Sequence, residues 1–343
     1  MMNPEYIKVY YNLLGLGIGP ESVKLFPEVV TRFYRINGAC FMLETPREKF
    51  ALWLATEDEP RLLAEQEILS LLKVKGNEGF LFPIRLKNNS FHGVLENGRL
   101  FYLTNWPELR PISFRNDLNI ESLVQLVIDF RMVMDHSGLS VLDVKMPGKP
   151  LIDRFQDMIN SLRSFMMLAS YRLHPTKFDQ MFLKHSELLV MEAELALNLI
   201  EISAYLKMYE EKGSFRPIIN DFSRSNLRVL PTGRAICISL KESTLDLPLV
   251  DLALLMVKTG RANRWSREWY DKIIKIYNKS FPLSKEVLEV IRAYLAFPWE
   301  LYRLAALYYH NRVNWPVCAF VEKMERILES KEANKKLIRN ISQ

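Results

Sequence analysis

The segment INDFSRSNL, from Ile219 to Leu227, is the most informative part of this sequence for its fold. It places an aspartate, Asp221, five residues before an asparagine, Asn226. In a phosphoryl-transfer site, a carboxylate in such a loop orients or deprotonates the attacking hydroxyl group, and the amide oxygen helps to hold a metal ion on the phosphates. A D-x4-N pair alone is a weak signal, so its interpretation depends on the surrounding sequence.

The loop is followed by a predicted hairpin. Two short apolar segments, residues 227–230 and 235–240, are separated by the turn residues PTGR at 231–234, which is typical of two paired strands. A later segment, LDLPLVDL at 245–252, opens a helix-like apolar run. Because loops on a rigid scaffold often carry the chemistry of a protein, we expect the functional residues here.

Upstream of this region the pattern is that of an antiparallel sheet, because short β-rich runs alternate with turn signals. These runs are residues 29–36, 39–45, 49–55, 81–86 and 100–104. Residues 60–72 have helical periodicity instead, with Pro60 placed to start a helix that packs on the sheet. The glycine-rich segment 15–20 is interpreted as a helix stop, since Pro20 lacks an N–H group that a phosphate-binding loop would use.

After Pro107, apolar residues recur at three- and four-residue spacing, which predicts helices. The predicted helical segments are residues 117–136, 152–170, 178–210, 248–259, 266–279, 284–296, 298–311 and 316–339. A chain of 343 residues also suits two lobes, because single cores stop growing beyond about 250–300 residues. We therefore predict a two-lobed α+β fold, with a leading helix and a small antiparallel sheet with one helix in residues 1–106 and a larger, mostly helical lobe in residues 107–343.

The composition excludes several functional classes. Hydrophobic residues make up 49% and charged residues 25% of the chain, as in a globular protein. The net charge of +6 is spread along the chain without a basic, aromatic-rich cluster, so we expect no nucleic-acid partner. Three scattered cysteines and five histidines predict neither disulfides nor a metal site. We also expect no export signal and no membrane insertion.

These motifs together resemble the aminoglycoside phosphotransferase and choline kinase superfamily, and within it the CotS family of bacterial spore coat proteins. The family likeness is carried by the Asp221 loop, the hairpin and the D-x-P-x-x-D-L segment at 246–252. It extends to FAL at 50–52 in a predicted strand and to FPW at 297–299 in a late helical segment. The resemblance covers about residues 5–335 and implies a protein-kinase-like fold.

The segment YLTNW at 102–106 corresponds to the family's hinge between lobes. The resemblance makes Leu103 and Asn105 candidate cofactor-binding residues in this hinge. It also places Glu65 on the helix whose carboxylate would pair with a phosphate-gripping lysine. Because that lysine is replaced here, we expect Glu65 to be solvated.

The departures from the family pattern concern the chemistry itself. The lysine of active relatives is Trp53, whose indole has one neutral donor and no charge. The metal-binding aspartate on the second hairpin strand is Ser239, a neutral hydroxyl group. The histidine two residues before the catalytic aspartate is Ile219, whereas Asp221 and Asn226 remain as the base and metal positions.

Two carboxylates of the pattern have simple structural interpretations. Asp221 is expected to stabilise its own loop by accepting backbone N–H bonds, as aspartate often does in turns. Asp251, at the start of an apolar helix, is expected to bind loop N–H groups and the helix dipole. The aromatic-rich stretches 265–270 and 299–309 are interpreted as core packing rather than as a cage for a quaternary ammonium group.

The sequence supports three functional hypotheses. The first is a degenerate kinase-fold protein without cofactor or metal, made in the mother-cell cytoplasm and deposited as a structural or scaffolding component among other spore coat proteins. The alternative is a phosphotransferase for small molecules or sugars that uses ATP and Mg²⁺, with Asp221 as base and Glu242, Lys49 or Arg47 replacing the lost groups. The third is a module that binds an unphosphorylated ligand.

Overall fold

The computed structural model describes residues 4–36, 38–55, 59–137, 148–211 and 214–341. Contacts between Cα atoms divide the chain into two compact units. The first unit consists of residues 1–113, 129–146 and 221–243, and the second unit of residues 114–128, 147–220 and 244–343. The lobe boundary between residues 106 and 107 stays a prediction.

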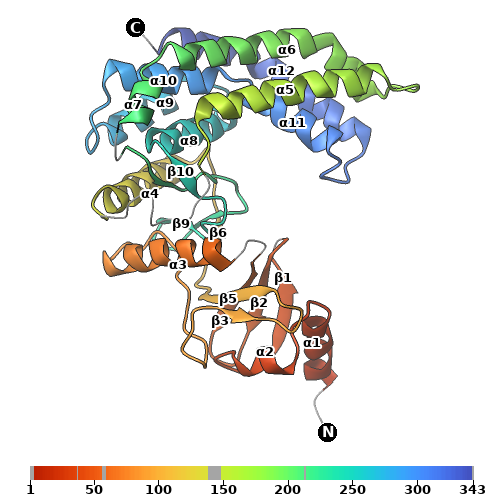
Figure 1. The fold of residues 1–343 in the computed structure, drawn as a ribbon, viewed down its shortest axis with the longest axis vertical. Helices are drawn as coiled ribbons and strands as arrows, with labels where there is room; N and C mark the ends of the chain where they lie inside the picture. The colour runs from red at the N-terminus through yellow and green to blue at the C-terminus, as the bar shows by residue number, and fades with distance from the viewer. Residues whose placement is uncertain (1–3, 37, 56–58, 138–147, 212–213, 342–343) are drawn as a thin grey trace. The chain divides into compact units, whose positions relative to one another are not determined.

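The first unit contains the strands of the sheet and the hairpin (Figure 1). Its elements are α1 (Pro4–Leu14), α2 (Pro20–Lys24), β1 (Arg32–Arg35), β2 (Cys40–Glu44), β3 (Lys49–Leu54), α3 (Glu59–Val74), β4 (Gly93–Val94), β5 (Leu100–Asn105), β6 (Arg110–Pro111), β8 (Leu227–Val229) and β9 (Ala235–Cys237). α4 (Asp117–Asp135) has residues in both units.

The second unit is mostly helical. Its elements are α5 (Leu151–Ser170), α6 (Lys177–Glu201), α7 (Tyr205–Glu210), β7 (Arg216–Ile218), β10 (Thr244–Asp246), α8 (Leu249–Ala262), α9 (Arg267–Tyr277), α10 (Lys285–Ala296), α11 (Trp299–Tyr309) and α12 (Val317–Arg339). Within it, α6 packs against α5, α10 and α12 (Figure 1). These helices match the predicted segments, except that residues 178–210 form two helices.

The sheet of the first unit has five antiparallel strands in the order β1-β2-β3-β5-β4. Its central strand β3 is buried on both faces, because successive side chains of a strand point to opposite sides. Phe50 and Leu52 belong to one core cluster, and Ala51 and Trp53 to the other. The predicted fold class, a small antiparallel sheet with one packed helix and a larger helical part, is confirmed.

One predicted strand was wrong. Residues 81–86 form no strand, and the segment contacts the sheet through an isolated bridge between Pro83 and Thr104. The reason is local, since proline has no N–H group for a ladder hydrogen bond. The edge of the sheet is formed instead by the two residues of β4. The short pair β7–β10 in the second unit was not predicted either.

The glycine-rich segment is a helix stop, as predicted, because α1 ends at Leu14 and α2 begins at Pro20. The N–H groups at the start of α2 bind the side chain of Glu96. The Glu96 carboxylate accepts hydrogen bonds from the backbone of Gly19 at 2.8 Å and of Ser22 at 3.1 Å, and from the Ser22 hydroxyl. Burial acts to raise the pKa of Glu96, but these hydrogen bonds outweigh it and lower the pKa to about 2.

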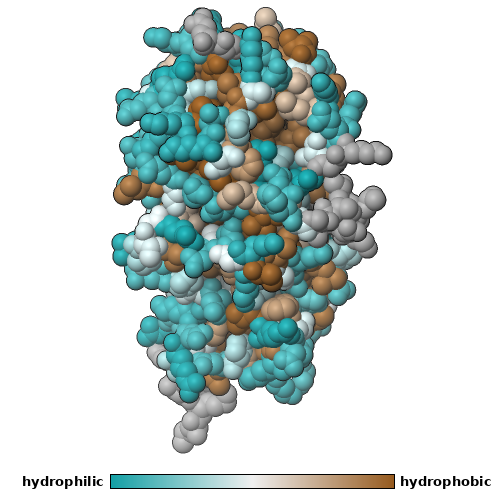
Figure 2. Space-filling view, turned by 90° about the vertical axis from the view of Figure 1, so that its left-hand side faces the viewer, coloured by the Kyte–Doolittle hydropathy of each residue, from teal (hydrophilic) through white to brown (hydrophobic). Residues whose placement is uncertain are grey.

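The surface is mixed in character. On the face shown in Figure 2, hydrophobic side chains reach the surface in several places between hydrophilic ones, which is ordinary for a folded chain. Among the residues that the structure describes, none of the helices combines the length and the apolar character needed to cross a bilayer.

The Glu96 contact leads to a prediction about stability. Because the folded-state pKa is depressed, the carboxylate stabilises the fold above its ordinary pKa of about 4.3, and this stability is lost as the pH falls toward about 2. Glu96→Gln keeps one acceptor oxygen but loses the negative charge and the second acceptor. It should therefore lower the melting temperature at pH 7 by about 2–4 °C, since a helix-capping side chain contributes about 1 kcal/mol. The difference from wild type should shrink when melting is measured at pH 3.

The matched control is Glu48→Gln, which changes an exposed carboxylate in a turn of the same unit. It should leave the melting temperature unchanged at both pH values. Equal melting of Glu96→Gln and wild type at pH 7, or an undiminished difference at pH 3, would contradict the prediction.

Candidate functional site

The first unit contains a pocket of about 410 Å³ at the positions that the sequence singled out. It is lined by the three candidate catalytic positions, Asp221, Asn226 and Ser239, and by two of the candidate cofactor-binding positions, Trp53 and Glu65. All of these residues belong to the same compact unit. The fold thus brings five of the seven predicted site residues together.

Trp53 lies in β3 and is packed as part of the sheet. Its side chain is 7% exposed, and its indole N–H donates a hydrogen bond to the Thr104 hydroxyl on β5 at 3.1 Å. The indole also stacks on Tyr102, its cross-strand neighbour, with ring centroids 6.1 Å apart and 12° between the planes. This position therefore presents an aromatic wall to the pocket and no positive charge.

Asp221 accepts hydrogen bonds from its own loop. One carboxylate oxygen accepts the backbone N–H of Ser223 at 2.8 Å, and the other accepts the Ser223 hydroxyl at 3.2 Å. This is the local bonding that aspartate makes in turns. The structure thus contains one backbone N–H bond of the expected kind, and the role of Asp221 in stabilising the loop stays a prediction.

Asn226 is buried and uses both ends of its amide. The NH₂ group donates to the carbonyl of Asp221 at 3.1 Å and to the sulfur of Cys237 at 3.4 Å. The amide oxygen accepts the backbone N–H of Ser239 at 3.0 Å. The side chain thereby connects the start of the loop to the end of β9, and the oxygen that would bind a metal ion already has a donor.

Ser239 and Asn226 themselves are poor ligands for a metal ion. Its hydroxyl oxygen accepts the backbone N–H of Lys241 at 3.1 Å. Within the described ranges, no group of three or more histidine, cysteine, aspartate or glutamate residues is placed to hold a metal ion. Mg²⁺ prefers carboxylate and water oxygens, so an amide oxygen bound to an N–H group and a neutral hydroxyl fit this ion poorly.

Helix α3 contributes a buried carboxylate and a buried guanidinium group. Glu65 is 5% exposed, so the expectation that it would be solvated was wrong. It lies three residues after Leu62, on the helix face that packs into the core beside the sheet. On the same helix, the Arg61 guanidinium donates to the carbonyl of Lys241 at 3.0 Å and to that of Ser243. These bonds connect α3 to the chain after β9.

The remaining two predicted site residues, Leu103 and Asn105, lie on β5 and do not line the pocket. Leu103 is fully buried in the core of the opposite sheet face, and its carbonyl accepts the N–H of Ile84 at 2.9 Å. Asn105 is exposed at the end of the strand. Neither lines the pocket, whereas Tyr102 does. Strand alternation could have identified Tyr102 and Thr104, because they lie on the same sheet face as the tryptophan.

Of the residues considered as replacements, only Glu242 lines the pocket. Lys49 forms an ion pair with Glu44 at 3.0 Å, and Arg47 approaches Glu28 at 3.9 Å. Both cations belong to the exposed turn and strand start that precede Trp53 by four to six positions.

In the second unit, the Asp251 carboxylate binds the first two residues of the 219–227 stretch. Its buried carboxylate accepts the N–H groups of Ile219 at 2.7 Å and of Asn220 at 2.8 Å. Burial raises the pKa of Asp251 to about 7, and the two N–H groups act against this shift. The expected role of Asp251, a carboxylate in the first turn of a helix bound by loop N–H groups, is confirmed.

Comparison with known sequences gives one curated relative. Spore coat protein S of Bacillus subtilis (strain 168) is 27% identical over 168 residues. The match covers 46% of this chain and 46% of that protein, so less than half of the relative's length is represented. No protein-family model matches the chain.

Comparison with solved structures extends over nearly the whole chain. An aminoglycoside phosphotransferase from Alicyclobacillus acidocaldarius superposes with a TM-score of 0.79 at 16% identity, covering 94% of this chain and 95% of that one. A spectinomycin phosphotransferase gives 0.69 at 15% identity, with 94% and 98% covered. The choline kinase LicA from Streptococcus pneumoniae gives 0.53 at 12% identity, with 92% and 97% covered.

At these identities the solved structures establish the fold. The sequence match adds a relative that is itself a spore coat protein, and it was found independently of the superpositions. The chain is therefore a distant homologue of spore coat protein S with the protein-kinase-like fold of the aminoglycoside phosphotransferases and choline kinases.

Proposed function

We propose that this protein is a degenerate kinase-fold protein that serves as a structural or scaffolding component of the bacterial spore coat. The observation that carries the proposal is the packing of Trp53, which stands where active relatives are expected to have a lysine. Homology to spore coat protein S supports the coat context. The partners are other coat proteins, and no cofactor is needed for this role.

Position 53 lacks the positive charge that phosphoryl transfer needs. In kinase-type sites, the phosphates of a nucleoside triphosphate are bound by a cationic side chain and a metal ion. The indole of Trp53 supplies only a neutral N–H group, which already donates to Thr104. Losing one such preorganised contact lowers turnover by roughly 10²–10³. Serine also stands at position 239, where active relatives are expected to have a metal-binding carboxylate, and losses at one catalytic centre are not additive.

The remaining polar groups of the loop have structural partners. The Asp221 carboxylate accepts two bonds from Ser223, and the Asn226 amide oxygen accepts the N–H of Ser239. A structural role explains why an aspartate and an asparagine occur at these positions without any catalytic function. This supports a structural role for the loop.

One observation favours a phosphotransferase with rearranged ligands as the second candidate. The pocket of about 410 Å³ is not filled by side chains, and Asp221 and Glu242 both line it together with Lys241. In that case Asp221 would act as base, Glu242 would supply a metal carboxylate, and ATP and Mg²⁺ would be required. Nucleotide binding separates the two candidates.

We predict that Mg²⁺ and ATP together do not raise the melting temperature of the wild-type protein. A ligand at 100 times its dissociation constant stabilises a fold by about 2.7 kcal/mol. This corresponds to several degrees for units of this size. Differential scanning fluorimetry at millimolar ATP, with and without Mg²⁺, measures the effect. The double variant Trp53→Lys with Ser239→Asp should show a small magnesium-dependent rise. It supplies a positive charge for the phosphates and a carboxylate for the metal ion.

Two controls accompany this measurement: removal of Mg²⁺ with EDTA, and the matched variants Glu242→Gln and Glu67→Gln. A rise in the wild-type protein that EDTA abolishes and Glu242→Gln reduces, while Glu67→Gln on the exposed side of α3 has no effect, would favour the phosphotransferase over the scaffold. Glu67 does not line the pocket.

A second prediction concerns the biological role. A fluorescent fusion should concentrate at the forespore surface during sporulation, and Asp221→Asn should concentrate there equally and restore the coat of a deletion strain. Asparagine keeps an oxygen that can accept the Ser223 N–H, but it cannot accept a proton from a substrate hydroxyl.

Asp221→Ala serves as the comparison, because it also removes the loop bonds and should lower stability by about 1 kcal/mol. A coat defect in a stable Asp221→Asn strain as severe as that of the deletion would point to catalysis. Uniform fluorescence in sporulating and growing cells would count against the coat assignment.

A further inference from the structure

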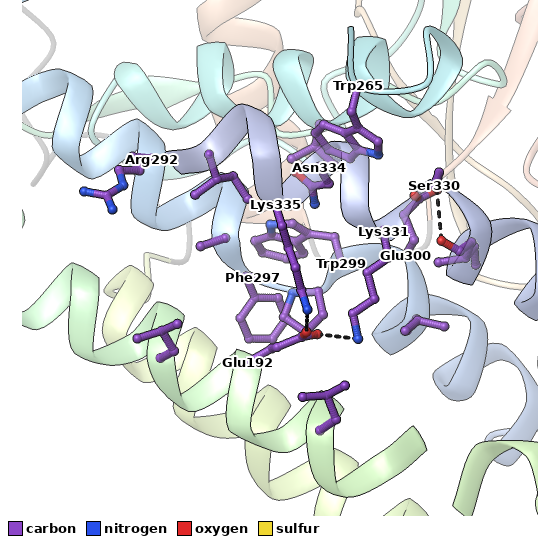
Figure 3. A pocket seen from close by; sticks show the side chains of 18 of the residues that line it. Glu192, Trp265, Arg292, Phe297, Trp299, Glu300, Ser330, Lys331, Asn334 and Lys335 are labelled. Carbon is purple, nitrogen blue, oxygen red and sulfur yellow. Dashed lines mark hydrogen bonds and ion pairs between the residues drawn. The ribbon is translucent and has the colours of Figure 1, made fainter. Parts of the chain in front are cut away.

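The second unit contains a pocket of about 630 Å³ that shares no residue with the pocket around Asp221. Figure 3 shows it in close view. Its lining comes from α6, from α10 and the start of α11, and from α12, with Val257 of α8 and Trp265. Every lining residue belongs to the second unit, and its volume is in the range of small-molecule sites.

One wall of the pocket is an apolar stripe on α6. Leu188, Met191 and Leu195 lie at positions i, i+3 and i+7, on one face of the helix. All three are exposed although they are large and hydrophobic. Phe297 and Trp299 also line the pocket, and Figure 3 shows them beside the charged groups. An apolar ligand would remove the exposed surface of the α6 stripe from water, which is favourable at about 25 cal/mol per Å².

The polar part of the pocket is a cluster of two lysines on one carboxylate. Lys331 and Lys335 of α12 contact Glu192 of α6 at 2.8 and 3.1 Å, and the three side chains converge in Figure 3. Glu192 and Lys331 are each only 15% exposed. Lys335 also approaches Glu332 at 3.6 Å, but Glu332 is 84% exposed and largely screened by water. The cluster therefore has an excess of positive charge in a partly desolvated place.

The other charges in the lining do not reverse this excess. Arg292 and Arg339 add two basic groups, and Glu300 adds one carboxylate. Glu300 forms an ion pair with Arg261 at 2.6 Å. The lining as a whole thus has four basic side chains, Arg292, Lys331, Lys335 and Arg339, against the two carboxylates Glu192 and Glu300.

We propose that this pocket binds a small amphipathic anion, that is, an apolar chain or ring that carries one carboxylate or phosphate group. The apolar part contacts the α6 stripe and the aromatic residues, and the anionic group binds Lys331 and Lys335, which together have one more positive charge than Glu192 neutralises. A cationic ligand is disfavoured by the same two lysines. The proposal is independent of the coat function, because it concerns residues outside the kinase-like site.

The test uses isothermal titration of the full chain with four ligands of equal chain length, each below its micelle-forming concentration. Decanoate and decyl phosphate should bind with one site per chain. Decanol and decyltrimethylammonium should bind at least about tenfold more weakly, since a charge-assisted contact is worth about 1.5–3 kcal/mol.

Three variants locate the site. Lys331→Met should weaken decanoate binding roughly tenfold. Glu192→Gln should strengthen it, because the isosteric amide removes the competing charge and leaves both ammonium groups for the ligand. Lys336→Met changes an exposed lysine of the same helix outside the lining, and it should have no effect. The opposite signs expected for Lys331→Met and Glu192→Gln distinguish the proposal from a general loss of structure.

Several outcomes would overturn the proposal. These are tighter binding of decyltrimethylammonium than of decanoate, weaker decanoate binding by Glu192→Gln, or no binding of either anion. A further arm uses vesicles that contain an anionic phospholipid. Binding to the vesicles without binding of the free anions would replace the small-ligand proposal with a membrane-surface one.

Discussion

The geometry of the kinase-like loop depends on the side-chain amide of Asn226. Its NH₂ group binds the carbonyl at the start of the loop, and its oxygen binds the backbone N–H of Ser239 beyond β9. A buried polar group that loses its partner costs about 1–3 kcal/mol. This amide therefore satisfies main-chain groups at two places that are 18 residues apart in sequence, from 221 to 239. The loop and the hairpin can keep their arrangement without a metal ion between them.

The sheet shows how a tryptophan is accommodated at position 53. A lysine at position 53 would need a carboxylate or a phosphate on the buried face of β3. Tryptophan instead joins the core cluster of that face, stacks on Tyr102 and donates its N–H to Thr104. Aromatic pairs contribute about 0.5–1.5 kcal/mol beyond the area that they bury. The indole is therefore held by packing and hydrogen bonding within the chain itself.

The sequence predicted the elements better than the contacts. Helices from α4 to α12 follow from apolar spacing, because a long periodic segment has one dominant solution. The predicted strand at 81–86 failed at Pro83, where the missing N–H group outweighed the β-rich composition. Glu65 was misplaced because a helix face is buried as a whole, including its carboxylate.

In the candidate site too, the positions of residues were easier to predict than their contacts. Sequence motifs correctly grouped Trp53 and the Asp221 loop around one pocket. The hydrogen bond from Trp53 to Thr104 spans 51 positions, and no local pattern reports such a partner. The hinge motif also pointed to Leu103, whose side chain is on the opposite face of the sheet. Motifs name positions, and strand alternation decides which of them share a face.

The contact of Arg61 has a consequence for motion. In protein kinases, the helix packed on the sheet moves, and its movement makes or breaks a lysine–glutamate ion pair. Here the Arg61 guanidinium is buried and binds two main-chain carbonyls, those of Lys241 and Ser243. Carbonyl groups carry no ionisable proton, so these bonds to α3 do not depend on the ionisation of a partner side chain. The position of α3 is therefore tied by Arg61 to the main chain that follows β9.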